Sequence, residues 1–248
     1  MNDGFEIEHR GAVTVITLGG AVPGNALTLP ALRELSSEIR SAGARPQTRV
    51  LRMRGRGDDF SIGRAAEKPG PDAPKTAHDI RTQLVEPILS VYAALRELPF
   101  PVVAEVAGRA TGLGCALVAA CDVAIASRSA WFSLPEMAKD LPPTLALSAL
   151  GRKAGAKAAA RLVYGLGELD AQGALIAGLV GEVVDDDALA AHVDAVCDRI
   201  ASRNPVALLA IKRYLRAMHD GDAEAMAELA ASVLSGAVSS IRSGVTER

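Results

Sequence analysis

Three short segments combine residue types that could hold and protonate a reactive carbonyl compound. Residues 60–65 (FSIGRA) form a predicted turn after a strand, and residues 108–122 (GRATGLGCALVAACD) form a glycine-containing loop that opens a predicted helix. Unpaired N–H groups at a helix start lie at the positive end of its dipole and stabilise an anion. Residues 131–140 (WFSLPEMAKD) place Glu136 directly after Pro135 at a predicted turn.

Together these segments predict an oxyanion hole with one carboxylate. Removing a proton beside a thioester carbonyl puts negative charge on the carbonyl oxygen, and losing one of two aimed N–H donors costs about 3 kcal/mol. Glu136 is a candidate for moving the proton at the adjacent carbon. Gly63 permits backbone angles that other residues avoid, and Gly112 and Gly114 allow a ligand to approach the backbone closely.

Each segment alone also has an ordinary interpretation. A Gly-x-Gly before a helix often reflects tight strand–helix packing, and a glutamate after proline is often a solvated residue at a helix start. The loop is not the dinucleotide-binding fingerprint, because Leu117 occupies the position of its third glycine. The sequence contains neither a Walker motif nor a Gly-x-Ser-x-Gly elbow. The order and combination of the three segments therefore carry the functional prediction.

Composition narrows the class of protein. The 248 residues are 49% hydrophobic and 23% charged, with a net charge of −2, so one large domain with a substantial core is expected and a nucleic-acid surface is not. Three cysteines and four histidines have no metal-ligand spacing, so we expect no metal. The first residues have no apolar signal-peptide region, and no apolar run approaches the length of a membrane span. We therefore expect a cytoplasmic protein without a membrane partner.

Alternating strand-like and helix-like stretches predict an α/β fold. The predicted strands are 5–9, 12–18, 50–53, 101–108, 122–126 and 179–184. The predicted helices are one capped by Thr28 and running to 42, then 76–98, 112–120, and 171–177 capped by Asp170. Residues 19–26 and the proline-rich stretch 67–75 are predicted loops, and 136–170 is expected to be mostly helical. Residues 187–248 are expected to form three helices, which divides the chain into a core at 1–186 and a C-terminal helical oligomerisation region at 187–248.

The sequence resembles the crotonase superfamily, the enoyl-CoA hydratase/isomerase family, over nearly its whole length. The matching motifs are NAL at 25–27, FSIGRA at 60–65, the block PVVAEVAGRATGLGCALVAACDVAIA at 101–126, LPE at 134–136, GLVGEVV at 178–184 and NPVALLAIK at 204–212. The resemblance implies a spiral of repeated ββα units with a C-terminal helical trimerisation region. It also implies an acyl-CoA substrate and an assembly that is a homotrimer or a dimer of trimers. Because coenzyme A is part of that substrate, no separate cofactor is expected.

The resemblance assigns roles to individual residues. The oxyanion donors would be the backbone N–H groups of Arg64 and Leu113, and Glu136 would be the acid/base. Lys68 and Arg64 are candidates for the CoA phosphates, although an exposed lysine is more often only solvated. The complete expected substrate-binding set, which includes the segments beside the pantetheine arm, is Asn25, Ala26, Leu27, Ile62, Gly63, Lys68, Gly112, Gly114 and Ala116. The acyl pocket is expected along 67–98.

Departures from the family pattern alter the expected reaction. Hydratases of the family use two glutamates, and the position of the first is Ala116 here, while the second is retained as Glu136. Two further positions that are acidic in members of the family are occupied here by Ala65 and Thr144. A single carboxylate can carry a proton between two carbons, so we expect isomerase-like chemistry; Asp140 or His78 are candidates for assisting it, although both are better interpreted as solvated.

Four alternatives remain open at this stage. The chain could be a hydratase that uses Glu136 alone, or a decarboxylase or thioesterase of the same fold, because the oxyanion hole also stabilises the intermediates of those reactions. It could also be a non-catalytic acyl-CoA binding protein.

Overall fold

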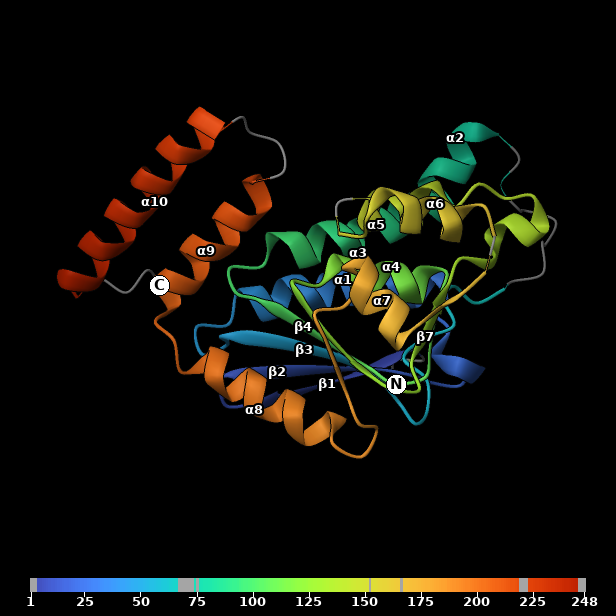
Figure 1. Cartoon of the computed structure of the whole chain (residues 1–248), viewed down its shortest axis with the longest axis horizontal. Helices are drawn as coiled ribbons and strands as arrows, with labels where there is room; N and C mark the ends of the chain where they lie inside the picture. The colour runs from blue at the N-terminus through green and yellow to red at the C-terminus, as the bar shows by residue number, and fades with distance from the viewer. Residues whose placement is uncertain are drawn as a thin grey trace.

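A six-stranded sheet forms the centre of the molecule in the computed structural model, which describes residues 4–66, 74, 76–151, 153–165, 167–218 and 223–244. The strand order is β1-β2-β3-β4-β6-β9, with β1 antiparallel to β2 and every other neighbouring pair parallel (Figure 1). The strands are β1 Phe5–Arg10, β2 Val13–Leu18, β3 Val50–Gly55, β4 Val102–Val106, β6 Val123–Ser127 and β9 Glu182–Val184.

A second, smaller sheet of three short strands carries two of the segments selected from the sequence. Its order is β5-β7-β8, where β5 and β7 are parallel and β7 and β8 antiparallel. The strands are β5 Arg109–Thr111, β7 Trp131–Ser133 and β8 Leu169–Asp170. None of the three was predicted, because two or three residues are too few for a periodic pattern to be visible.

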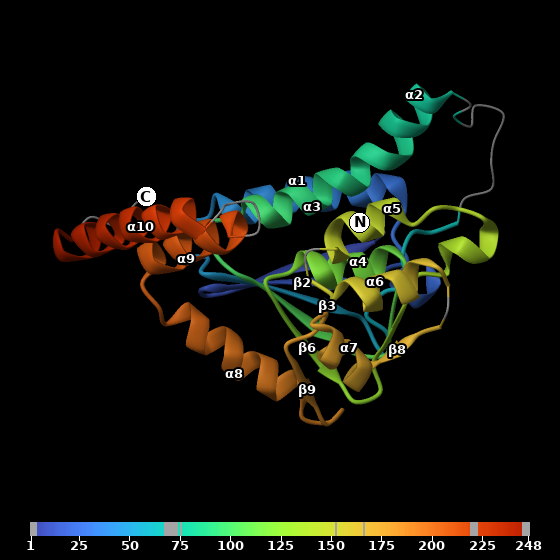
Figure 2. The same cartoon turned by 45° about the horizontal axis from the view of Figure 1, so that its top comes forward.

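Helices cover both faces of the central sheet. Those on one face are α1 Leu29–Gly43, α3 Glu86–Glu97, α4 Leu113–Ala120, α5 Thr144–Leu150, α6 Ala156–Val163 and α7 Ala171–Ala177. Helix α2, Ala77–Ile80, has no buried residue and projects beyond α3 (Figure 2). Short irregular turns lie at Pro23–Asn25 (η1), Arg81–Val85 (η2) and Pro135–Lys139 (η3). Helix α8, Leu189–Ala201, lies against the opposite face (Figure 2). Helices α9, Pro205–Ala217, and α10, Ala223–Arg242, lie side by side and project from the body as a C-terminal hairpin (Figures 1 and 2).

The predicted helix starts are confirmed by their capping bonds. Ala31 N–H donates to the Thr28 hydroxyl at 3.2 Å, and Gly173 N–H donates to the Asp170 carboxylate at 2.7 Å. The predicted helix 76–98 is present as α2, the π-helical turn η2 and α3 in succession, beginning at the capping residue Thr76. The stretch 136–170 is helical only in separate pieces, whereas the three predicted C-terminal helices are all present.

Two apolar clusters, one on each face of the sheet, hold these layers together. The larger joins the sheet to α1, α3, α4 and α5, and the smaller joins Val50, Val103 and Ile125 to the buried side of α8. Arg52, only 2% exposed, sits on the α8 face and pairs with Glu105 of β4 and with Asp194 of α8. Arg52 and Glu105 are buried, whereas the Asp194 side chain is exposed, and this ion triad was not apparent in the sequence.

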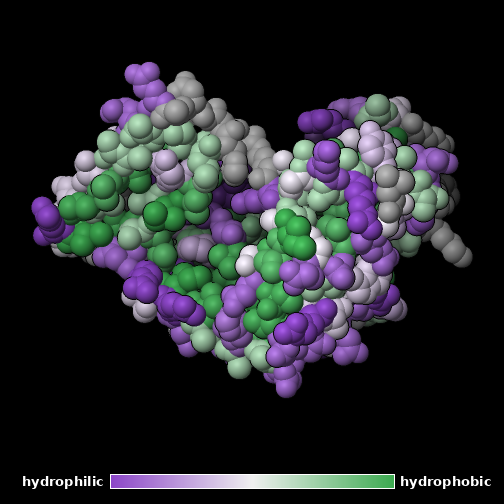
Figure 3. All heavy atoms as spheres, viewed as in Figure 1, coloured by the Kyte–Doolittle hydropathy of each residue, from purple (hydrophilic) through white to green (hydrophobic). Residues whose placement is uncertain are grey.

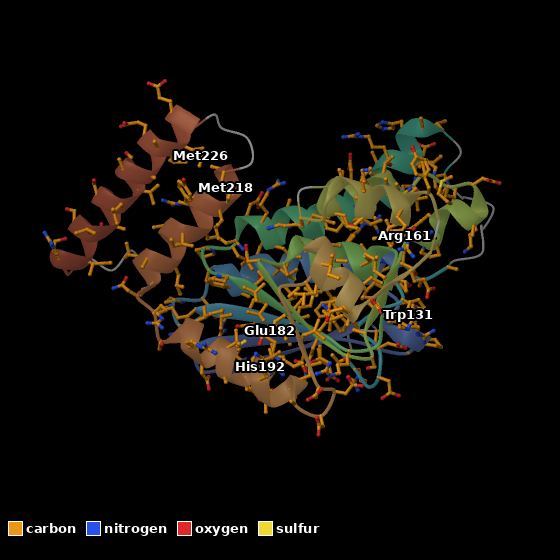
Figure 4. All side chains as sticks on the ribbon, viewed as in Figure 1. Trp131, Arg161, Glu182, His192, Met218 and Met226 are labelled. Atoms are coloured by element: carbon orange, nitrogen blue, oxygen red, sulfur yellow. The ribbon has the colours of Figure 1, made fainter. Side chains whose placement is uncertain are left out.

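A further polar contact joins α8 to the edge of the sheet. His192 Nε2 lies 2.9 Å from Glu182 Oε1 of β9, and the two side chains approach each other from the helix and the strand (Figure 4). Helix α8 is therefore fixed to the sheet by polar contacts as well as by its apolar side.

Candidate active site

Four backbone segments lie side by side beside the start of α4, and we call them the backbone frame: 25–27, 61–65, 109–113 and 131–136. Leu27 pairs with Arg64 and Ser61 pairs with Ala110 in isolated parallel bridges. Strand β5 then pairs with β7, which leads into Glu136. All three segments selected from the sequence are therefore adjacent in space.

The Arg64 N–H is left unpaired by the hydrogen bonds around it. Gly63 has φ +103, and its N–H donates to the Ser61 hydroxyl at 3.1 Å. On the other side, Ala65 N–H donates to the Leu27 carbonyl at 2.9 Å. Within the described ranges no hydrogen bond uses the Arg64 N–H. A backbone donor in a fixed orientation is therefore available here, as the sequence predicted.

The Leu113 N–H lies next to it at the start of α4. Gly112 precedes the helix with φ +54 and donates its own N–H to the Ser133 carbonyl at 2.9 Å. Leu113 is the first helical residue, so its N–H has no partner inside the helix. A Cβ on Gly63 would lie 3.1 Å from Leu113 N and 2.9 Å from the Thr111 carbonyl. The two turns therefore touch, which brings the two donors to one place.

Close backbone contacts and two side chains brace this arrangement. A Cβ on Gly114 would lie 2.1 Å from the Ser61 carbonyl oxygen, so only glycine fits there. Thr111 Oγ1 donates to the Ile62 carbonyl at 3.1 Å, and Ser61 Oγ donates to the Asn25 carbonyl at 2.8 Å. The sequence gave no separate signal for Ser61 or Thr111 beyond their place in the selected segments.

An ion pair fixes the outer end of the same segments. Arg109 Nε and its backbone N–H donate to Asp59 Oδ1 at 2.9 and 3.0 Å. This hydrogen bonding from Arg109 lowers the pKa of Asp59 below its ordinary value, outweighing the opposing effect of burial. The pair ties the turn at 60–65 to β5, and sequence reasoning did not find it.

Glu136 lies directly over the helix start. A Cβ on Gly112 would lie 3.1 Å from Glu136 Oε1, and the buried Oε2 has no hydrogen-bond partner in the part of the chain that the structure describes. Burial raises the pKa of this carboxyl, while a backbone hydrogen bond of its own residue and the charge of Lys139 act in the opposite direction. A partly buried carboxyl with an unused oxygen is suited to accept and return a proton.

Tyr92 and Cys115 are the titratable neighbours of this carboxyl. Burial, with a smaller contribution from the charge of Glu136, raises the pKa of Cys115 to about 12, so the thiol is protonated at neutral pH and is not a nucleophile. Burial also raises the pKa of Tyr92, and the charges of Cys115 and Glu136 add to the effect. Tyr92, on α3, was not selected from the sequence because an aromatic residue on a helix is usually part of the core.

The other expected site residues differ in how they are placed. The Asn25 amide donates to the carbonyls of Arg56 and Asp59 at 2.9 and 2.7 Å, so this side chain supports the frame from inside. Ala116 is fully buried on α4, and Ala26 and Leu27 are also buried. Lys68, expected at the CoA phosphates, lies outside the described residues.

Three further polar residues considered from the sequence lie at the surface. Asp140 is exposed with φ +54 at the end of η3, and His78 is exposed on α2. Thr144 is exposed at the first turn of α5. Glu136 is thus the acidic side chain that the structure brings to the two backbone donors.

Among the described residues, no group of His, Cys, Asp and Glu side chains is arranged to hold a metal ion. In the same part of the chain, no helix is both long and apolar enough to cross a lipid bilayer.

Comparison with known proteins identifies the family. The family model for enoyl-CoA hydratase/isomerase matches residues 8–247. The chain is 30% identical over 204 residues to the mitochondrial enoyl-CoA hydratase domain-containing protein 3 of Xenopus laevis, covering 82% of this chain and 68% of that protein. It is 31% identical over 215 residues to the 2,3-dehydroadipyl-CoA hydratase of Escherichia coli, covering 85% of this chain and 80% of that protein.

Solved structures give the same result for the fold. An enoyl-CoA hydratase/isomerase family protein from Silicibacter pomeroyi superposes with a TM-score of 0.87 at 28% identity, covering 94% of this chain and 97% of the other. The enoyl-CoA hydratase from Bacillus anthracis gives 0.86 at 26% identity, covering 95% and 91%. The predicted crotonase-type α/β fold with C-terminal helices is therefore confirmed. The chain belongs to the enoyl-CoA hydratase/isomerase family and is an enzyme of that family acting on acyl-CoA.

Proposed function

We propose that this enzyme shifts a proton along the acyl chain of an enoyl-CoA thioester with one carboxylate. The thioester oxygen is held by the N–H groups of Arg64 and Leu113, and Glu136 is the acid/base. The observation that carries the proposal is the position of Glu136 over Gly112, beside both unpaired donors, with a buried oxygen that has no partner among the described residues.

The proposed steps follow from these groups. The Glu136 carboxylate removes a proton from the carbon next to the thioester carbonyl, and the electron pair of that C–H bond delocalises to the carbonyl oxygen. The N–H groups of Arg64 and Leu113 stabilise the resulting enolate. Glu136, whose carboxyl proton exchanges with solvent, then delivers a proton to the far carbon of the conjugated system, which moves the double bond by one position. No atom is gained or lost.

The residue at position 116 favours isomerisation over two-carboxylate hydration. Concerted addition of water requires one group to deprotonate the water and another to protonate carbon. Ala116 is fully buried and has no acidic group. One carboxylate, Glu136, is sufficient for transfer between two carbons.

Hydration by Glu136 alone is the second candidate, because two similar proteins are named hydratases. These are the 2,3-dehydroadipyl-CoA hydratase of Escherichia coli and the short-chain-enoyl-CoA hydratase of Clostridium acetobutylicum, which is 28% identical over 210 residues. In this version the oxygen of a water molecule would bond to the second carbon from the carbonyl, while Glu136 takes a proton from that water and delivers it to the carbon next to the carbonyl.

Mass spectrometry of enoyl-CoA thioesters in deuterated water separates these reactions. Isomerisation gives deuterium uptake without addition of water, whereas hydration adds one water. Release of free CoA would indicate a thioesterase, and loss of carbon dioxide from a carboxylated thioester would indicate a decarboxylase. Tight binding with no change in mass and no deuterium uptake would contradict any catalytic role and would leave an acyl-CoA binding protein.

The first prediction concerns the carboxylate itself. Glu136→Gln keeps the size of the side chain but cannot carry a proton, so kcat is expected to fall by about 100-fold to 10,000-fold. Binding of a saturated acyl-CoA should change little. Glu34→Gln, an exposed glutamate on α1, is the matched control and should keep full activity. Full activity of Glu136→Gln would overturn the mechanism.

The assembly is proposed from the C-terminal hairpin. Helix α10 exposes Leu234 and Ile241, and helix α9 exposes Ile211, which lies outside the cavity between the hairpin and the body. Leu234 and Ile241 are seven residues apart, which places them in a row along α10. Apolar rows of this kind indicate a surface that another chain covers, and a homotrimer or dimer of trimers would cover them.

For the CoA phosphates, the exposed Arg64 side chain and Lys68 remain the proposed partners.

A further inference from the structure

A cavity of about 930 Å³ lies between the body of the molecule and the C-terminal hairpin. Its walls come from α3, the end of α4, the end of α5 and the last turns of α9. Figure 3 shows a hollow between the hairpin and the body, with hydrophobic residues on the hairpin beside it. The cavity is distinct from the backbone frame, whose residues do not line it.

The charges on the walls of this cavity are strongly unequal. Asp122 is the one acidic residue of the lining, and it is already paired with Lys212, which also donates to the Leu95 carbonyl at 3.2 Å. Four more cations line the cavity, namely Arg96, Lys153, Arg213 and Arg216. In the described ranges none of these four has a carboxylate partner. A positive cavity has therefore formed in a chain whose net charge is −2.

Helix α3 connects this cavity to the active site. Tyr92 lies close enough to Glu136 and Cys115 to be affected by their charges, and it also lines the cavity. Arg96 follows four residues later and lines the cavity one helical turn farther on, on the same side of α3. Leu89 and Ala93 complete this wall, so it changes from apolar to cationic with distance from the carboxyl.

Helix α4 gives the distance between the donors and the cavity. It begins at Leu113, one of the two proposed oxyanion donors, and its residues Ala119 and Ala120 line the cavity. At 1.5 Å per residue, the donor and Ala119 are about 9 Å apart along the helix. This distance suits a medium-length acyl chain, with long arginine and lysine side chains closing the remaining gap.

From these observations we infer that the cavity binds the far end of the acyl group and selects an acyl group that ends in a carboxylate. The inference rests on the proposed function, which fixes the thioester carbonyl at Arg64 and Leu113. Leu89, Tyr92 and Ala119 contact the methylene groups, and Arg96, Lys153 and Arg213 supply the charge for the terminal carboxylate. An uncharged acyl end would leave these like charges together without a partner.

Binding of two matched thioesters tests this inference without depending on catalysis. Adipyl-CoA and hexanoyl-CoA have the same number of acyl carbons and differ only in a terminal carboxylate or methyl group. Calorimetry on the full-length protein is expected to give a Kd about tenfold lower for adipyl-CoA. Equal affinities, or a preference for hexanoyl-CoA, would overturn the inference.

Two exposed cations supply the variants. Arg96→Gln and Lys153→Gln should each weaken adipyl-CoA binding and leave hexanoyl-CoA binding unchanged, and the double variant should remove the preference. Lys157→Gln removes an exposed charge four residues after Lys153 and outside the cavity lining. It is the matched control and should keep the preference for adipyl-CoA. Circular dichroism checks that the variants remain folded.

Free CoA and free adipate distinguish other sources of negative charge. If the cations bind CoA phosphates, the variants will weaken the binding of free CoA and of both thioesters equally, which contradicts the inference. If the cations bind any free anion, free adipate will bind as tightly as adipyl-CoA, which also contradicts the inference.

Turnover of 3,4-dehydroadipyl-CoA and 3-hexenoyl-CoA, which carry the C2 hydrogens that Glu136 would remove, then separates this inference from the proposed function. Reaction of hexenoyl-CoA with no advantage for the dehydroadipyl thioester would reject the cavity assignment and keep the function. A carboxylate preference in binding, with no reaction of either thioester, would reject the function and keep the cavity assignment.

Discussion

The backbone frame and the C-terminal hairpin differ most in how closely they are packed. In the frame, added side-chain atoms would collide with backbone atoms, as at Gly114, where a Cβ would lie 2.1 Å from the Ser61 carbonyl oxygen. In the hairpin, Gly236 of α10 has no atom within 4 Å of the same position, and Leu234 is 65% exposed. The difference indicates that the frame is complete within one chain, whereas the hairpin has a surface suited to contact with another.

Substituting the same residue type in each region should give opposite results. Gly114→Ala forces the start of α4 away from Ser61, so the two donors separate; we expect a loss of about 3 kcal/mol in stability and a fall in kcat of about 100-fold or more. Thermal unfolding and the turnover assay measure both effects.

Gly236→Ala is the matched change in the hairpin. Alanine is the better helix former, so this variant should be about 1 kcal/mol more stable and fully active. If both substitutions had the same effect on activity, the contrast in packing between the two regions would not matter for catalysis.

A charge placed on the hairpin should change the assembly while leaving the frame intact. Leu234→Glu puts a carboxylate in the exposed apolar row of α10, and we expect about 2 kcal/mol less association free energy per protomer. Light scattering after size exclusion should show dissociation at low concentration. Ser232→Glu adds the same charge two residues away, on the other side of α10, and should leave the mass unchanged. A trimer that survives Leu234→Glu would contradict the proposed interface.

A smaller effect is expected from the ion pair at the outer end of the frame. Asp59→Asn should cost about 1 kcal/mol, because it removes the charge but keeps the hydrogen-bonding shape. The pKa of Asp59 is lowered by Arg109, so its contribution is present above its ordinary pKa and is lost as the pH falls through the lowered value. Urea unfolding from neutral to acidic pH should show this loss in the natural chain and less of it in the variant.

The smallest effect should be the contribution of Glu136 to stability. Its pKa is raised, chiefly by burial, so any stabilisation is present below its ordinary pKa and is lost as the pH rises through the raised value. Glu136→Gln should therefore be slightly more stable than the natural chain at neutral pH, and the difference should shrink on acidification. A variant less stable at neutral pH would show that the carboxylate has a stabilising partner.

Sequence reasoning predicted those parts of the molecule whose signals are local. Thr28 and Asp170 were identified as helix caps from the residues around them, and Gly63 and Gly112 from their place in loops. Both glycines have positive φ, as the expected tight turns require. The long predicted helix at 76–98 is also present, although its residues 81–85 adopt a π-helical turn that no residue pattern indicated.

The missed features depend on partners far away in the chain. Arg52 is buried only because Glu105 and Asp194, which lie 53 and 142 residues later, meet it across the sheet. Asp59 and Arg109 are likewise 50 residues apart. The sequence alone indicates that Tyr92 is an ordinary aromatic residue of the core, and only the fold brings α3 close to Glu136. Contacts of this kind can be identified only when the three-dimensional path of the chain is known.

The unpaired N–H groups of Arg64 and Leu113 also affect how this site can change during evolution. A donor that belongs to the main chain is not removed when its own side chain is replaced, so the exposed position 64 is free to vary in size and charge, whereas the buried position 113 can vary among apolar residues while the hole persists. The mutations that would erase it fall on glycines, which touch no substrate atom through a side chain. Among related sequences, loss of activity should therefore follow changes at Gly63, Gly112 and Gly114 more closely than changes at the two donor residues themselves.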